Sequence, residues 1–340
     1  MGYSISICIP VYNCAEYLGQ ALNSILHQTD KQVEVIVYDG GSTDGTRALM
    51  ENYVSAWPNL QFHRGNDRGG IDADMATCAS FAQGEYIWLF SGDDVMRPGA
   101  IQRALVWIEN GEDVYLCEHT ICNLEMLILR SYPMLAPNKP TCIDLSDPIL
   151  RLEWFRRALT TEPFFSFMSS IMVRREKWQS GRFIENFDGS CWGHVARLFE
   201  LMPSGLRVCY VAEIWLDQRG GNDSFSDKGV VNRTRIGIEG YHKLADVYFG
   251  HDSKEAFHIR RVIRNEFTLR SFLRNKCHCQ ESPQRESRKL LDELFFKAYC
   301  DTSLTSMLCK IFYRILPIQF IKLIRKVYQW GKGILKKDKR

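Results

Sequence analysis

The sequence predicts an α/β protein in which a doubly wound, mostly parallel sheet is flanked by helices. Two observations carry this prediction: β-rich apolar runs alternate with segments of helical periodicity, and polar or glycine-rich loops follow the runs. A chain of 340 residues, 45% hydrophobic and 24% charged, can also bury a sizeable core. We therefore expect an ordinary globular protein of one large domain or two.

The first third of the chain repeats a unit of strand, loop and helix. After the first strand, Leu18, Leu22, Ile25 and Leu26 recur at the spacing of one helix face. The expected strands are 4–9, 33–38, 60–63 and 85–90, and the expected helices are 15–27, 46–57, 73–82 and 99–110. Because such connections join parallel strands, the carboxyl ends of these strands should meet at one edge of the sheet.

Beyond this part the pattern loosens and then becomes strongly helical. We expect strands at 114–117, 168–173 and 207–211, and helices at 148–159, 191–201, 231–249, 255–273 and 284–299. The chain then divides into a sheet-based domain (1–228), a helical region (229–303) and a basic amphipathic tail (304–340).

The net charge of +3 conceals an asymmetry along the chain. From Lys310 onward there are ten Lys/Arg residues and one acid, Asp338, which gives +9 and leaves −6 for the preceding 309 residues. A basic tail on an acidic body favours attachment to an anionic surface over a general nucleic-acid binder. We expect no nucleic-acid partner.

The residues after Pro317 have the pattern of a helix that lies in a membrane interface. A helical wheel gathers Phe320, Leu323, Ile324, Val327, Tyr328, Trp330, Ile334 and Leu335 on one arc and Lys322, Arg325, Lys326, Gln329, Lys332 and Lys336 on the other. The alternative is an amphipathic helix docked on the body of the protein. No run reaches the ~20 apolar residues of a membrane span, and no signal peptide is apparent. We expect a cytoplasmic protein held peripherally on the cytoplasmic face of the inner membrane.

The cysteines favour a reducing compartment. The chain has twelve, and seven of them are scattered through apolar elements of a large chain, so we expect reduced core thiols. These seven are Cys8, Cys14, Cys78, Cys117, Cys142, Cys191 and Cys209.

Two adjacent carboxylates, Asp93 and Asp94, follow the apolar run 86–90 after Ser91 and Gly92. A buried strand that ends in paired acids places hard oxygen ligands at the carboxyl edge of a sheet. A divalent cation of the Mg²⁺ or Mn²⁺ type that bridges to a substrate diphosphate is the natural counter-charge. The alternative is a turn that caps the helix beginning near Arg97 and Pro98.

Two further loops should meet the acidic pair. They are 11–13, after the first strand, and the glycine-rich loop 39–44, after the second. The three loops would form a nucleotide-shaped pocket, in which Asp39 can accept hydrogen bonds from a base or a ribose. Alternatively, Asp39-Gly40-Gly41 is only a tight turn in which Ser42 or Thr43 caps the next helix.

At these motifs the sequence resembles the inverting family 2 glycosyltransferases of GT-A fold. The resemblance covers roughly residues 3–225 and rests on the P-x-Y-N strand end (Pro10, Tyr12 and Asn13), on the variant D-G-S-T-D loop 39–44, and on the G-E-Y strand 84–86 followed by D-D. It implies that Pro10, Tyr12 and Asn13 contribute to the donor nucleotide site together with Asp39, which would hold the base. It also implies that Asp93 holds the ribose or the metal, and Asp94 the metal and diphosphate.

Within that family the sequence resembles enzymes that add deoxyhexoses such as abequose to bacterial O-antigen repeat units. Residues 69–74, 86–90 and 219–224 carry this likeness. Asp72 and Asp74 would face the donor, or else they form an exposed acidic helix start. Arg219 lies in a glycine-rich loop and would pair with a diphosphate of donor or acceptor, or else it is a surface arginine.

One departure from the family concerns the general base. Members usually carry an E-D pair at the start of a helix, and here that register falls on Ser190-Cys191. Asp188 or His194 would then remove the acceptor proton, and a third possibility is that neither does.

The resemblance thus implies transfer of a sugar from a nucleotide-diphosphate donor to a hydroxyl of a polyprenyl-diphosphate-linked oligosaccharide. Two alternatives are a nucleotidyltransferase, which would carry a basic glycine-rich loop after the first strand, and a sugar-nucleotide-binding scaffold that has lost its base.

Overall fold

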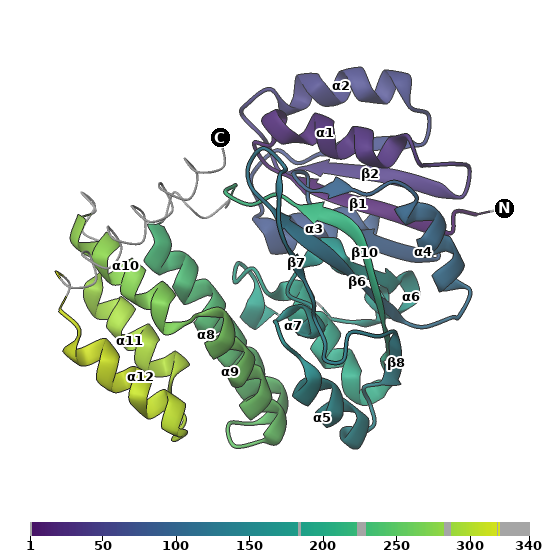
Figure 1. Ribbon diagram of the computed structural model, residues 1–340. Coiled ribbons are helices and arrows are strands. Elements are labelled where there is room, and N and C mark those ends of the chain that lie inside the picture. Colours follow the sequence, from purple (N-terminus) through teal and green to yellow (C-terminus); the bar gives the residue numbers. More distant parts are fainter. Residues whose placement is uncertain (1, 183–184, 223–228, 282–286, 318, 320–340) are drawn as a thin grey trace, which may run out of the picture. The chain divides into compact units, whose positions relative to one another are not determined.

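The computed structural model describes residues 2–182, 185–222, 229–281, 287–317 and 319 (Figure 1). They divide into two units, one made of 1–223 and 246–259 and the other of 224–245 and 260–340. The amphipathic tail expected after Pro317 lies almost wholly outside the described residues.

The first unit is built on a mixed, mostly parallel sheet. Its described strands are β1 (Ile5–Val11), β2 (Val33–Asp39), β3 (Leu60–Arg64), β4 (Tyr86–Leu89), β5 (Val95–Met96), β6 (Val114–Cys122), β7 (Ile128–Tyr132), β8 (Thr141–Asp144), β9 (Ile171–Arg174) and β10 (Arg207–Gln218). Their order is β3-β2-β1-β4-β9-β6-β10-β5, with β7 on β6 and β8 on β10. β1 pairs in parallel with β2 and β4, as the sequence predicted.

Helices cover both faces of this sheet (Figure 1). The helices of the first part are α1 (Ala15–Leu26), α2 (Thr46–Ala56), α3 (Ile71–Ser80), α4 (Ala100–Ile108), α5 (Pro148–Arg157), α6 (Arg175–Ser180) and α7 (Gly193–Leu201). Alternation along β1 sorts the two faces: Ile5 and Ile7 join the core that includes α1 and α4, and the Cys8 thiol contacts the Cys78 carbonyl of α3. The fold class predicted from the sequence is confirmed.

The carboxyl-terminal part is helical, with α8 (Gly229–Phe249), α9 (Lys254–Glu266), α10 (Leu269–Glu281), α11 (Arg288–Ala298) and α12 (Leu304–Ile315). In the second unit an aromatic cluster joins three of these helices, because Phe272, Phe295 and Tyr313 stack or meet edge to face. The single helix expected at 255–273 is wrong: the chain breaks after Glu266, and Thr268 Oγ1 accepts from the Ser271 amide at the start of α10.

Two strands run further than their hydrophobic patterns indicated. β10 reaches Gln218 instead of 211 and passes a residue of positive φ, Ala212 (φ 57°), while β6 reaches Cys122 instead of 117. Polar residues interrupt both apolar runs, so the pattern ends before the strand does. The extension of β10 carries the chain to Arg219 at the carboxyl edge of the sheet.

The expectation of reduced core thiols is wrong for one pair. Cys142 and Cys209 are joined by a disulfide, because the antiparallel register of β8 and β10 sets them opposite each other with their Cα atoms 4.0 Å apart. The other cysteines named above are free thiols.

Candidate functional site

The candidate site lies at the carboxyl edge of the sheet, where β1, β2 and β4 end side by side. β9 runs antiparallel to β4, so the short 3₁₀ helix Met168–Ser170 that precedes it reaches the same edge. The Ser91 amide donates to Ser169 Oγ at 3.0 Å. The structure thus brings the three expected loops together and adds a fourth segment.

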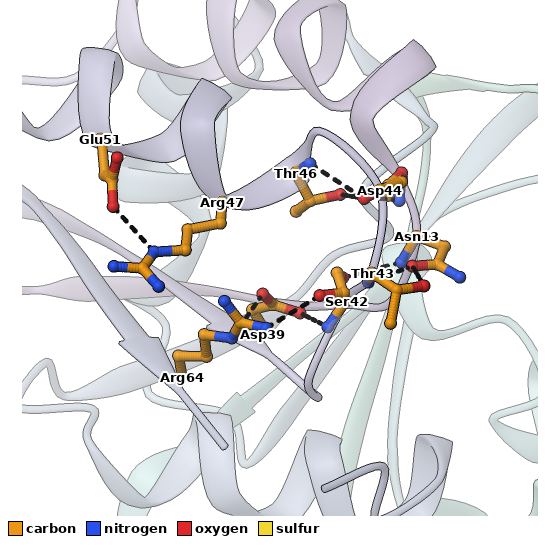
Figure 2. Close-up of polar contacts among 10 residues, drawn as sticks. Asn13, Asp39, Ser42, Thr43, Asp44, Thr46, Arg47, Glu51 and Arg64 are labelled. Carbon is orange, nitrogen blue, oxygen red and sulfur yellow. Dashed lines mark hydrogen bonds and ion pairs between the residues drawn. The ribbon is translucent and has the colours of Figure 1, made fainter. Parts of the chain in front are cut away.

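Asp39 ends β2 and is fully buried. Its Oδ1 accepts a hydrogen bond from the Ser42 amide (2.7 Å), and its Oδ2 lies 3.5 Å from Nε of Arg64 (Figure 2). Within the described residues no donor forms a hydrogen bond to Oδ2. A buried polar atom without such a bond costs about 1–3 kcal/mol. This oxygen is therefore available to accept a hydrogen bond from a ligand.

Asn13, just after the end of β1, forms hydrogen bonds that hold the loop after Asp39 in place. The backbone N–H of Asn13 donates to Ser42 Oγ, and its side-chain Oδ1 accepts from the backbone N–H of Thr43, each at 2.8 Å (Figure 2). Its φ of 50° is a left-handed conformation that asparagine tolerates. In this structure Asn13 shapes the pocket around Asp39, and direct contact with a nucleotide stays a prediction.

Pro10 and Tyr12 frame the same loop. Pro10 is buried in β1 opposite Tyr38. Tyr12 is half-buried, with the Arg68 guanidinium 4.1 Å from its ring centroid. Tyr12 therefore adds an aromatic face to the carboxyl edge.

Asp93 and Asp94 have different surroundings. Asp94 is 2% exposed; its Oδ2 accepts from Ser169 Oγ (2.6 Å) and its Oδ1 from the Arg219 amide (3.0 Å). Burial, followed by the charge of Asp93, raises the pKa of Asp94 well above its usual range. Asp93 is half-buried and accepts from Ser91 Oγ and from Asn222 Nδ2 (2.9 Å). Of the two, Asp93 is the carboxylate that meets solvent.

The acid pair fits a divalent cation that a substrate completes. Among the described residues no three His, Cys, Asp or Glu side chains gather as a metal cluster. Mg²⁺ needs no such cage, because it is usually held by one or two carboxylates together with water and substrate phosphate oxygens. Asp93 supplies an accessible carboxylate, and Asp94 fixes the loop behind it.

Arg219 is buried, at 7% exposed, and each end of its guanidinium is engaged. Nε donates to the Asp93 carbonyl (2.9 Å), Nη1 to the Leu124 carbonyl (2.5 Å) and Nη2 to Gln20 Oε1 (2.5 Å). The group also lies 4.7 Å from the ring centroid of Tyr17. Arg219 thus joins the acidic loop, the β6–β7 hairpin and α1. A role on a diphosphate would require it to exchange these partners.

The hairpin between β6 and β7, whose Leu124 carbonyl accepts from Arg219, carries exposed aliphatic side chains. Leu127, Ile128 and Leu129 are 66%, 59% and 65% exposed. Ile128 and Leu129 are consecutive on β7, so they point to opposite faces and both faces of the strand are open. The Gly220 amide donates to the Cys122 carbonyl at 3.1 Å, which ties the hairpin to the end of β10.

Asp72 and Asp74 lie in the first turn of α3 and are each 5% exposed, so neither is an exposed helix start. Asp72 accepts from the amides of Cys191 (2.8 Å) and Gly193 (2.9 Å). It therefore fixes the loop that leads into α7, close to the region where the general base was sought. Burial raises its pKa.

Asp74 packs against the loop after β2. A Cβ on Gly40 would overlap Asp74 Oδ2, so a larger residue at this position would displace the Asp74 carboxylate. Burial raises the pKa of Asp74. Asp74 thus adjoins the Asp39 loop, as a donor-site residue would.

The two candidate bases differ in accessibility. Asp188 is exposed in the loop before α7, whereas His194 is 6% exposed in the first turn of α7. Burial lowers the pKa of His194 to about 4. Because His194 is almost inaccessible and Asp188 is exposed, Asp188 is the candidate that an acceptor could reach, and its role as the base stays a prediction.

Three polar residues at this edge were not assigned from the sequence: Ser169, Asn222 and Arg64. Arg64 directly follows an expected strand and could have been found by the same edge argument. Ser169 carries no such signal, because it precedes an antiparallel strand and its contact with Asp94 spans 75 residues.

Comparison with known proteins finds similarity in the part of the chain that carries the candidate site. Residues 6–160 match the family model described as "Glycosyl transferase family 2". The match covers 155 of the 340 residues and includes the three loops of the candidate site.

Three individual similarities extend over almost the whole chain. The sequence is 26% identical over 336 residues to the abequosyltransferase RfbV of Salmonella typhimurium, which covers 95% of this chain and 98% of that protein. The structure resembles residues 1–349 of S. aureus TarS in complex with UDP-GlcNAc, with a TM-score of 0.61 and 18% identity over 96% of this chain and 92% of that one. It also resembles the mannosyltransferase PcManGT of Pyrobaculum calidifontis in complex with GDP-Man and Mn²⁺, with a TM-score of 0.51 and 15% identity over 94% and 84%. These likenesses confirm the expected fold.

Proposed function

We propose that this protein is a family 2 glycosyltransferase that moves a sugar, with inversion, from a nucleotide-diphosphate donor to a sugar hydroxyl of a polyprenyl-diphosphate-linked oligosaccharide. The observation that carries the proposal is the buried Oδ2 of Asp39, which lacks a hydrogen bond within the described residues and sits at the same sheet edge as the acidic loop. A base N–H or a ribose hydroxyl would supply the missing donor. Pro10, Tyr12 and Asn13 would complete the nucleotide site.

The acidic loop would receive the donor diphosphate. Asp93 would hold Mg²⁺ or Mn²⁺ together with phosphate oxygens, and Asp94 would support it from the interior, where its partners are Ser169 and the Arg219 amide. The bound ion would supply electrostatic stabilisation of the departing nucleotide diphosphate. The buried cation of Arg219 would add to the positive potential behind the loop.

The acceptor side would use the loop before α7. Asp188 would remove the proton of the acceptor hydroxyl as its oxygen attacks the anomeric carbon from the face opposite the leaving group. Asp72 would position this loop through the amides of Cys191 and Gly193. Asp74, beside Gly40, would line the donor side.

The proposal of a lipid-linked acceptor has two supports. The β6–β7 hairpin, which Arg219 joins to the acidic loop, carries exposed leucines that would suit a lipid-bearing acceptor. The basic carboxyl-terminal tail would hold the protein on the cytoplasmic face of the inner membrane. Among the helices that the structure describes, none is long and apolar enough to cross a membrane.

The similarity to an abequosyltransferase along most of the chain supports a deoxyhexose donor and a place in O-antigen synthesis. Radiolabelled sugar transfer from a panel of UDP, GDP, CDP and dTDP sugars to bacterial lipid extract tests the proposal. We expect transfer with one donor, dependent on divalent metal and lost in Asp93→Asn. Donor binding without transfer to any lipid fraction would contradict it and favour a binding scaffold.

A further inference from the structure

Helix α12 carries a continuous apolar stripe on its exposed side. At 100° per residue its six large hydrophobic side chains fall within an arc of about 140°. Their exposed fractions are 72% for Leu304, 51% for Met307, 45% for Leu308, 50% for Ile311, 47% for Phe312 and 64% for Ile315. A stripe of this kind on a soluble surface marks an interaction site.

The opposite side of α12 fixes how the helix is seated. Ser306 and Tyr313 are buried, with the Tyr313 ring stacked on Phe295 at 3.8 Å between centroids. Lys276 Nζ donates to the Tyr313 carbonyl (2.6 Å), and Arg264 Nη1 to Ser306 Oγ (2.9 Å). Because these contacts hold the polar and aromatic side inward, the stripe faces outward within its own unit.

Charge distinguishes among the possible occupants of the stripe. Arg314 borders the stripe on the wheel, with its guanidinium 4.8 Å from the ring centroid of Phe296. From Lys310 onward the sequence carries ten Lys/Arg residues and one acid. Such a density of cations would repel a second copy of this same region, and it complements an anionic lipid surface.

We propose that the apolar stripe of α12 is the face through which this protein binds an anionic membrane surface. The stripe enters the interface between headgroups and acyl chains, and the following basic residues add attraction to anionic headgroups. This inference rests on the proposed function, in which the carboxyl-terminal tail holds the protein on a membrane, and it adds the apolar face that makes the contact.

Flotation of the full chain with lipid vesicles tests the proposal. We expect binding to vesicles of phosphatidylglycerol and phosphatidylethanolamine and much weaker binding to phosphatidylcholine. The double variant Leu308→Asp/Ile311→Asp should lower the partition into anionic vesicles by at least about tenfold, because two charges would have to enter the interface. The control Val106→Asp changes a side chain of α4 that is 65% exposed and should bind like the wild type.

Two further measurements keep the outcomes distinct. Circular dichroism and transfer to a short soluble acceptor should be unchanged in the double variant, which separates lost attachment from lost folding or lost glycosyl transfer. Equal vesicle binding by the double variant, or no binding by the wild type, would overturn the proposal. A wild-type dimer that the double variant dissociates, without vesicle binding, would assign the stripe to a second copy and overturn it as well.

Discussion

Replacing Asp94 by asparagine or by alanine separates the effect of its hydrogen bonds on stability from the effect of its negative charge. The carboxylate is 2% exposed and has two internal donors, the Ser169 hydroxyl and the Arg219 amide. In Asp94→Asn, Oδ1 still accepts from the Arg219 amide, and Nδ2 can donate to Ser169 Oγ, because a hydroxyl serves as either donor or acceptor. In Asp94→Ala both partners lose their contact.

The size of the difference follows from these contacts. A buried donor left unsatisfied costs about 1–3 kcal/mol, so two of them lower the free energy of unfolding of Asp94→Ala by about 3 kcal/mol. In a unit of this size the cost corresponds to a fall in Tm of about 6–12 °C. Asp94→Asn should stay within about 1 kcal/mol of the wild type, since it keeps both contacts and removes a charge that burial disfavours.

The pH dependence gives an independent check. The pKa of Asp94 is raised in the folded protein, so the native state binds a proton that the unfolded chain has released above its pKa of about 3.9. The contribution of this group is therefore fully present below that pH and is lost as pH rises toward the folded pKa. In Asp94→Asn the free energy of unfolding should no longer show this decrease with rising pH.

Urea unfolding monitored by circular dichroism at several pH values measures both effects. The control Glu51→Gln changes an exposed carboxylate of α2 and should shift stability by no more than about 0.5 kcal/mol. Equal destabilisation by asparagine and alanine would refute the reasoning, because the negative charge, and not its hydrogen bonds, would then hold the loop.

Three further predictions concern binding and turnover. Asp39→Asn should weaken nucleotide affinity, measured by calorimetry, by about tenfold. The side-chain NH₂ that replaces one carboxylate oxygen is a hydrogen-bond donor and would face the donor group expected on the ligand. Unchanged affinity would show that Asp39 does not bind the nucleotide. Asp188→Asn should depress transfer by orders of magnitude at unchanged donor affinity. If His194 were the base instead, His194→Ala would depress transfer in the same way, and the wild-type transfer rate would fall as pH drops through about 4. Leu127→Ser should raise KM for a lipid-linked acceptor and leave KM for a short soluble analogue unchanged. If the variant and the wild type have the same KM for the lipid-linked acceptor, the hairpin does not bind the acceptor.

The sequence by itself was sufficient for the fold class and for the edge that holds the site. Alternation of apolar runs with helical segments predicts parallel strands, and parallel strands bring their carboxyl ends together. The positions of Asp39, Asp93 and Asp94 at or shortly after the ends of such strands therefore predicted their proximity. These are local patterns, each readable within about ten residues.

The tertiary structure decided what each of these side chains contacts. Asp93 and Asp94 are adjacent in the sequence, yet one is half-buried and the other nearly inaccessible, and the 3₁₀ helix before β9 brings Ser169 to Asp94 across 75 residues. Asp72 holds the loop before α7 across 119 residues of sequence. No periodicity encodes such pairs.

Arg219 and the cysteines show the same division. The glycine-rich loop around Arg219 indicated a ligand contact, but the length of β10 sets the guanidinium against Leu124 and Gln20. Scattered cysteines in a large chain indicated free thiols, but the register of β8 against β10 sets Cys142 opposite Cys209. Strand length and register depend on packing between distant segments, and for this reason only the folded chain determined these contacts.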